Sequence, residues 1–213
     1  MADPVVIAVD GPAASGKGTL ARRIAAELGY AYLDTGLLYR SVGLALLRAG
    51  GDPADAKAAV EAATSLDADF ADFTDPALRN EATALAAGIV AAIPAVRHAL
   101  IGMQRRFASH PPGGAPGAVL DGRDIGTVIC PDADYKFFID ADLEERGRRR
   151  VKELQDKGVE SIPARVLQEM KERDERDRTR AVAPLAPAAD ASVVDTTNLN
   201  ADAAFALAMS FIR

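Results

Sequence analysis

Short runs of consecutive apolar residues alternate along this chain with longer segments in which apolar residues recur at helical spacing. The runs predict five strands, over residues 5–10, 31–34, 118–121, 135–140 and 192–195. A helical segment separates each strand from the next. Because strands that alternate with helices pair in parallel, the pattern predicts an α/β fold with a parallel sheet flanked by helices.

Capping residues and helix breakers mark the ends of several predicted helices. Asp-Pro pairs precede two of them, because aspartate caps a helix and proline is tolerated in its first turn. A glycine follows the helix that ends at residue 28, and a Pro-Pro-Gly-Gly stretch follows the helix that ends at residue 109. On this basis, helices are expected over residues 19–28, 53–64, 76–92 and 95–109.

A glycine-rich turn joins the first strand to the first helix. Glycines let backbone N–H groups approach anionic oxygens, a lysine adds a positive charge, and a helix N-terminus favours negative charge. The turn therefore predicts a site for the phosphates of a nucleoside triphosphate, and the alternative is an ordinary strand-to-helix turn. It consists of Gly11, Pro12, Ala13, Ala14, Ser15, Gly16, Lys17, Gly18 and Thr19.

This turn departs from the plain Walker pattern, in which serine or threonine directly follows the lysine and faces the metal. Here Gly18 intervenes and Thr19 comes second, a variant that resembles the turn of nucleoside monophosphate kinases. Asp121, at the end of an apolar strand, lies where a Walker B carboxylate is expected. Thr19 and Asp121 are therefore the predicted Mg²⁺ site, with contact through water as one possibility.

Charged residues follow two further strands at the edge where α/β proteins bind ligands. Arg40, after the second strand, can hold a phosphate with its planar guanidinium, although a solvated helix residue is the alternative. After the third strand, Arg123 can meet phosphate. Asp124 offers an acceptor for the amino group of cytosine, where uracil would present an oxygen.

An arginine-rich region follows the fourth strand. Arg173, Arg176, Asp177 and Arg180 fall at positions i, i+3, i+4 and i+7 and are expected to share one helix face. In isolation such a run is typical of a solvated helix, but beside a phosphate loop it suits phosphoryl transfer. Residues 146–180 are therefore predicted to form a lid that excludes water.

Composition limits the remaining possibilities. The 213 residues are 49% hydrophobic, which suffices for one α/β core. A net charge of −6 and a pI near 5.0 favour neither nucleic acid nor an anionic membrane as partner. The single cysteine, Cys130, is interpreted as core packing, and His98 and His110 have no partner at metal-ligand spacing. The N-terminal residues lack a signal-peptide pattern, so we expect a cytoplasmic protein, and we expect a monomer.

Four motifs together resemble the bacterial cytidylate kinase family: the glycine turn, Leu-Asp-Thr-Gly-x-x-Tyr-Arg, Asp-Gly-Arg-Asp-x-Gly-Thr-Val, and Glu-Arg-Asp-x-Arg-Asp-x-x-Arg-x-x-x-Pro-Leu. The resemblance covers nearly the whole chain. It implies a P-loop kinase fold with a five-stranded parallel sheet, a nucleoside monophosphate (NMP) binding insert and an arginine-rich helical lid. The implied single domain has its core at about residues 1–60, 93–142 and 190–213, its insert at 61–92 and its lid at 143–181.

The resemblance also implies roles for individual residues. The glycine turn and Arg149 would bind ATP, while Lys17, Arg123, Arg178 and Arg180 would be the catalytic residues. The implied CMP-binding residues are Thr35, Arg40, Gly88, Arg97, Arg123, Asp124, Arg173, Asp177 and Arg180.

Two departures from the family bear on base and sugar selectivity. Thr35 and Gly88 both stand where the family commonly has serine. The segment from residue 66 to 79 is shorter than the usual insert, and Phe70 and Phe73 are interpreted as its packing residues.

The resulting hypothesis is a kinase that transfers the γ-phosphoryl group of Mg-ATP to CMP or dCMP, a step of pyrimidine nucleotide metabolism. One alternative is a kinase of another nucleoside monophosphate or small metabolite on the same fold. The other is a regulatory NTP-binding module without transfer activity.

Overall fold

The computed structural model describes residues 3–66 and 73–212, so the prediction for Phe70 lies outside the described residues. The chain divides into two compact units, one of residues 1–33 with 108–213 and one of residues 34–107. The first unit contains the sheet, and the second is built from helices. Each unit is described separately below.

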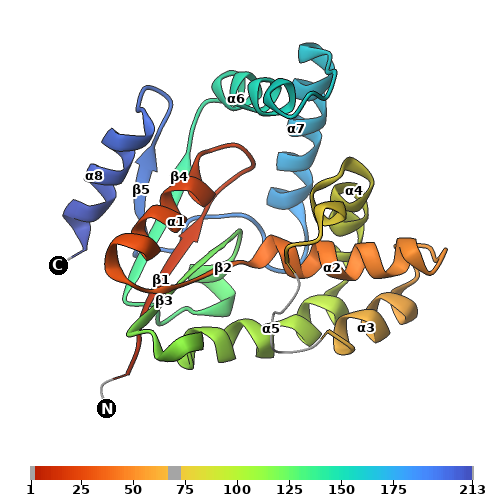
Figure 1. The fold of residues 1–213 in the computed structure, drawn as a ribbon, viewed down its shortest axis with the longest axis horizontal. Coiled ribbons are helices and arrows are strands. Elements are labelled where there is room, and N and C mark those ends of the chain that lie inside the picture. The colour runs from red at the N-terminus through yellow and green to blue at the C-terminus, as the bar shows by residue number, and fades with distance from the viewer. Residues whose placement is uncertain (1–2, 67–72, 213) are drawn as a thin grey trace. The chain divides into compact units, whose positions relative to one another are not determined.

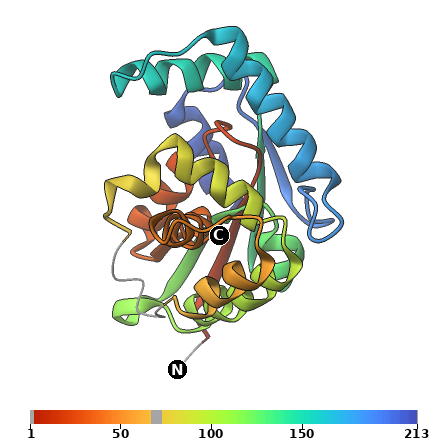
Figure 2. The same ribbon diagram turned by 90° about the vertical axis from the view of Figure 1, so that its right-hand side faces the viewer.

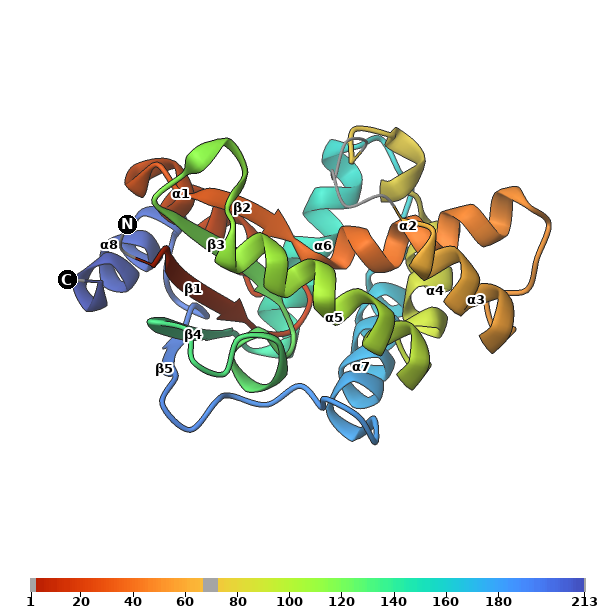
Figure 3. The same cartoon turned by 90° about the horizontal axis from the view of Figure 1, so that it is seen from below.

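The sheet confirms all five predicted strands, with the third longer by one residue at each end. Its strands are β1 (Val5–Asp10), β2 (Ala31–Asp34), β3 (Gly117–Gly122), β4 (Tyr135–Asp140) and β5 (Ser192–Asp195). They form a parallel sheet in the order β2-β3-β1-β4-β5, with β1 between β3 and β4 (Figure 3). The α/β class with a five-stranded parallel sheet is therefore as predicted.

Two helices of the first unit pack on the sheet and cover its apolar side chains. Helices α1 (Lys17–Leu28) and α8 (Ala201–Phe211) pack on β1, β4 and β5 (Figure 1). Their buried residues include Leu20, Ile24 and Ala208, which meet Ile7 and Phe137 in the main core cluster. The helical faces of α1 and α8 thus bury the apolar side chains that the strands present.

Helices α6 (Leu143–Asp156) and α7 (Pro163–Thr179) follow β4 in the first unit and pack against each other (Figure 2). Gly147 allows this approach, because a Cβ there would lie 2.8 Å from a methyl carbon of Leu167. A short π-helical segment, η3 (Ile125–Ile129), follows β3.

The second unit is a small helical bundle with its own core. It contains α2 (Thr35–Arg48), α3 (Ala56–Thr64), the 3₁₀ segment η1 (Pro76–Arg79), α4 (Glu81–Val90) and most of α5 (Pro94–Ser109). Leu38, Val42, Val90 and Leu100 are almost fully buried in its core. Phe73 packs against this cluster, as predicted.

The structure corrects several predicted helix boundaries, and the cause is visible for three of them. The helix predicted from residue 53 begins only at Ala56, because Asp55 rather than Asp52 accepts from the first backbone N–H groups. The helix predicted over residues 76–92 is divided at Asn80, which caps α4 by accepting from Thr83 N at 2.7 Å. The third boundary is the end of α7, which the arginine pattern placed beyond Arg180 and which lies at Thr179.

Within residues 3–66 and 73–212, no single helix is long and apolar enough to cross a membrane. One strongly bent pair of helices reaches the length and apolar composition of a membrane span only when both helices are counted as one segment.

Candidate functional site

The predicted phosphate loop follows β1 and leads into α1, as the sequence indicated. Gly11 has φ +150°, and a Cβ at this position would overlap the carbonyl oxygen of Ile139. Gly16, which precedes α1, has φ +92°, and Ala14 has φ +58°. These positive φ values bend the chain in a short space, as in the glycine-rich turns whose backbone N–H groups bind anions.

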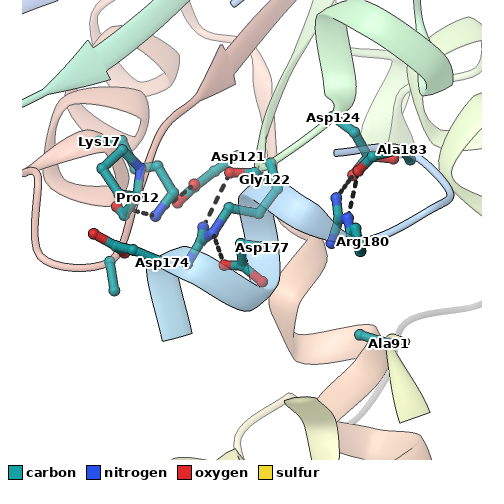
Figure 4. Close-up of polar contacts among 12 residues, drawn as sticks. Pro12, Lys17, Ala91, Asp121, Gly122, Asp124, Asp174, Asp177, Arg180 and Ala183 are labelled. Atoms are coloured by element: carbon teal, nitrogen blue, oxygen red, sulfur yellow. Dashed lines mark hydrogen bonds and ion pairs between the residues drawn. The ribbon is translucent and has the colours of Figure 1, made fainter. Parts of the chain in front are cut away.

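Lys17 lies beside the carboxylate of Asp121, near the carboxyl end of β3 (Figure 4). Its Nζ is 3.5 Å from Pro12 O and 3.7 Å from Asp121 Oδ1. The other oxygen of Asp121 accepts a hydrogen bond of 3.2 Å from the Tyr32 hydroxyl. A Cβ at Gly18 would lie 2.8 Å from that same oxygen, which explains why glycine follows the lysine here.

Thr19 lines a pocket of about 350 Å³ at the start of α1. The floor of the pocket is apolar, with Leu20, Ile139 and Leu199, and Arg149 lies at its polar side. Gly18 lies directly against Asp121, and the assignment of Thr19 and Asp121 as a metal pair stays a prediction. Among the described residues no group of three or more His, Cys, Asp or Glu side chains could hold a metal ion.

Arg149, predicted for the ATP site, reaches the phosphate loop from α6. Its guanidinium donates to Ser15 O at 3.4 Å and to Thr196 O at 2.6 Å, and its Nε donates to Glu145 at 2.9 Å. Thr196, directly after β5, also donates from its hydroxyl to Ser15 O at 2.8 Å. These contacts fix the backbone of the phosphate loop at Ser15.

Two ion pairs connect the segment after β3 with the end of α7. Arg123 donates from Nε to Asp177 at 3.0 Å, and a guanidinium nitrogen of Arg180 lies 3.4 Å from Asp124. Burial alone would raise the pKa of Asp177, but the charges of Arg123, Arg173 and Arg180 outweigh it and hold that pKa below its usual range. Four of the predicted acceptor-site residues are thus brought together.

The remaining predictions on α7 met with different outcomes. Arg180 is not on the helix, because its backbone is extended with φ −60° and ψ 139° and its Nε donates to Ala183 O. The predicted shared helix face therefore ends before Arg180. Arg173 and Arg178 lie on α7 and are exposed, and Arg173 acts on Asp177 through its charge. The catalytic role of Arg178 stays a prediction.

In the second unit, two predicted arginines are held by backbone carbonyls. Arg40 donates to Leu78 O at 2.7 Å. Arg97 is 4% exposed, donates to Ala91 O at 3.3 Å and lies over the ring of Tyr39 at 5.4 Å. Both guanidinium groups therefore have fixed positions within this unit.

The two remaining predicted residues of the second unit differ in burial. Thr35 is buried as the first residue of α2. Gly88 is exposed on α4, and a Cβ there would meet nothing within 4 Å. The position of Gly88 therefore has room for a larger side chain.

Three residues near the carboxyl ends of the strands were not among the predicted site residues. Asp10 is buried and accepts from Ile125 N and Gly126 N, both at 2.8 Å. Asp10 ends a predicted strand and Thr196 directly follows one, which was the available signal, whereas Tyr32 lies within β2 and had no such signal.

Comparison with known proteins agrees with this geometry. A family model described as cytidylate kinase matches residues 7–213. The cytidylate kinase of Paramagnetospirillum magneticum is 61% identical over 207 residues, 97% of either chain. That of Rhodospirillum rubrum is 55% identical over 208 residues, 98% of this chain and 97% of its own. A crystal structure of an uncharacterized protein from Eubacterium ventriosum shares the fold, with a TM-score of 0.55 at 15% identity over 98% of both chains.

Proposed function

This chain belongs to the cytidylate kinase family, and from that premise we propose that it transfers the γ-phosphoryl group of ATP to CMP or dCMP. One observation carries the proposal, namely that three cationic side chains gather at the carboxyl ends of the central strands. Lys17 comes after β1, Arg123 comes after β3, and Arg180 contacts Asp124 in the segment after β3. Phosphoryl transfer needs cations of this kind around the oxygens whose charge redistributes in the transition state.

The donor nucleotide is proposed to occupy the phosphate loop and the pocket beside Thr19. The apolar floor of that pocket suits a nucleobase, and Arg149 offers a planar cation at its side. The loop N–H groups and Lys17 would then hold the β- and γ-phosphates. Residues 11–19 and Arg149 are the proposed ATP site.

The residues present fit a magnesium ion that is carried in with ATP. Mg²⁺ prefers one or two carboxylates together with phosphates and water, and Asp121 supplies one carboxylate beside Lys17. Asp121 and Thr19 would hold the ion directly or through water. When bound, the ion would neutralise charge on the donor phosphates.

The acceptor is proposed to bind at Arg123, Asp124, Arg173, Asp177 and Arg180. The phosphate of CMP is already ionised near neutral pH, so it can attack in line without a general base. Asp124 would accept from the amino group of cytosine, which uracil lacks. In the second unit, the family resemblance adds Thr35, Arg40, Gly88 and Arg97 to the proposed CMP contacts.

The finer architecture follows from the same assignment. We propose that α6 and α7 form the arginine-rich lid, at about residues 143–181, and that residues 61–92 form a shortened NMP-binding insert. The rest of the chain would be the core of a single P-loop kinase domain that acts as a monomer. Support for the lid comes from Arg149 and Arg173, which these helices carry.

The proposal is tested by measuring ADP release from ATP with CMP, dCMP, UMP and AMP as acceptors. Turnover is expected with CMP and dCMP and much less with the others. Preference for UMP or AMP would indicate another monophosphate kinase, and ATP binding without acceptor-dependent turnover would indicate a regulatory module.

Replacement of Lys17 tests the role of the phosphate loop. Lys17→Ala is expected to lower kcat by about 100-fold or more, because a preorganised cation at the transferred phosphate is lost. Lys57→Ala is the matched control, since its side chain is 88% exposed on α3. An unchanged kcat in Lys17→Ala would contradict the mechanism.

A further inference from the structure

We propose that Tyr32 is a positioning residue, whose hydroxyl fixes the Asp121 carboxylate and thereby keeps Lys17 available to the donor phosphate. The inference rests on the proposed function, because it concerns the same phosphate loop. Tyr32 lies on β2 and Asp121 is the next-to-last residue of β3, so the contact joins neighbouring strands of one sheet.

The Tyr32 hydroxyl accepts one hydrogen bond and donates another. Arg22 Nη1 donates to it at 3.4 Å, and it donates to Asp121 Oδ2 at 3.2 Å. The Arg22 guanidinium also lies over the Tyr32 ring, with Cζ 5.7 Å from the ring centre. A hydroxyl that accepts from a cation donates more strongly, so Arg22 strengthens the hold of Tyr32 on the carboxylate.

This hold sets the distance between Asp121 and Lys17. Asp121 is buried, and with Oδ2 fixed by Tyr32, its Oδ1 lies 3.7 Å from Lys17 Nζ. That separation is longer than a close charge-assisted hydrogen bond of about 2.7–2.9 Å. The contact between the Lys17 ammonium group and Asp121 is therefore a loose ion pair.

Gly18 gives the carboxylate the space for this arrangement. A Cβ at Gly18 would lie 2.8 Å from Asp121 Oδ2, on the oxygen that Tyr32 holds. The carboxylate thus lies directly against the first turn of α1, where the Tyr32 hydroxyl holds its Oδ2. Without the hydroxyl, Asp121 can turn toward Lys17, pair with it closely and compete with phosphate for the ammonium group.

Tyr32→Phe tests the proposal, with Tyr30→Phe as the matched control. Tyr30 lies just before β2, and its ring packs against Gly117 rather than Asp121. Each variant is made in the wild-type and in the Asp121→Ala background. The readouts are the Kd of ADP by calorimetry, and kcat and the KM for CMP from ADP release.

Tyr32→Phe is expected to raise the Kd of ADP and to lower kcat by about 10-fold each, as loss of a hydrogen bond to a charged group implies. The KM for CMP should stay within about twofold of wild type, as should every parameter of Tyr30→Phe. In the Asp121→Ala background, Tyr32→Phe should have no further effect, because Tyr32 acts through Asp121.

Two results would overturn the proposal: wild-type parameters in Tyr32→Phe, or an equal loss in both backgrounds, which is the mark of a merely structural role. The ADP affinity does not depend on the acceptor. A wild-type protein that fails to phosphorylate CMP would therefore refute the proposed function while the calorimetric cycle still decides the role of Tyr32.

Discussion

Arg146 and Asp174 form a buried ion pair in which a guanidinium nitrogen lies 2.6 Å from a carboxylate oxygen, with side-chain exposures of 3% and 5%. Arg146 also donates to Ala141 O at 2.8 Å and to Ala13 O at 3.3 Å. Helix α6 is thereby joined both to α7 and to the phosphate loop. The pair connects the proposed lid helices with the backbone that is proposed to hold ATP.

Removing one partner of this pair should be costly. Asp174→Ala leaves the Arg146 charge buried without its carboxylate, and such a change typically lowers the free energy of unfolding by about 3–5 kcal/mol. Urea unfolding measures the loss. Glu153→Ala is the control, because its ion pairs with Arg150 and Lys157 lie at the surface and such pairs contribute about 1 kcal/mol or less each. Similar small losses in both variants would contradict a special role for the buried pair.

Gly11→Ala should disrupt the phosphate loop. The φ of +150° is one that L residues rarely adopt, and a Cβ at this position would overlap the backbone carbonyl of Ile139, which cannot turn aside as a side chain can. We expect a loss of about 2 kcal/mol or more in the free energy of unfolding, with a matching loss of ATP affinity. Gly50→Ala is the control, because a Cβ there meets nothing within 4 Å although φ is +67°. Gly50→Ala should lose less stability, and the difference between the two losses measures the effect of the overlap with Ile139.

The sequence predicted the strands well because buried parallel strands are continuous apolar runs that local composition reveals. The phosphate loop was equally visible, since Gly11 and Gly16 occupy positions that only glycine fills easily. Helix starts were less certain where two caps compete. Asp52 and Asp55 are both suitable caps, and only the folded chain shows that Asp55 accepts from the helix N–H groups.

Side-chain partners could not be predicted, because they depend on how distant strands and helices meet. The sequence pointed to Arg123 and Asp177 as ligands of an acceptor, yet gave no indication that they pair with each other across 54 positions. The end of α7 shows the same limit. The sequence pattern continues the helix to Arg180. The helix ends at Thr179 because Arg180 donates to Ala183 O and contacts Asp124.

The Arg123–Asp177 pair predicts a pH-dependent contribution to stability. The pKa of Asp177 is lowered in the folded protein, so its contribution is present above the unfolded value of 3.8 and lost as pH falls through the folded value. Asp177→Asn should therefore be less stable than wild type at about pH 7, and the difference should shrink below about pH 4. Urea unfolding at both pH values measures this. A difference that persists unchanged in acid would show that charge is not its source.

Asp10 predicts the opposite dependence on pH. It is almost fully buried just before the phosphate loop, and burial raises its pKa from 3.8 to about 7, although hydrogen bonds from Gly126 N and Ile125 N oppose the shift. Because the folded protein holds the proton more tightly than the unfolded chain, the contribution of Asp10 is fully present below pH 3.8. That contribution is lost as pH rises through about 7.

Asp10→Asn isolates this contribution, because the amide cannot ionise while every other group titrates as before. The free energy of unfolding of wild type minus that of Asp10→Asn should decrease by about 2 kcal/mol between about pH 5 and about pH 8. Urea unfolding without nucleotide or Mg²⁺ measures the difference, and Asp156→Asn, an exposed change at the end of α6, should give a constant difference. If the Asp10 difference instead grows with pH, the two backbone N–H donors outweigh burial, and Asp10 holds the loop as a carboxylate throughout this range.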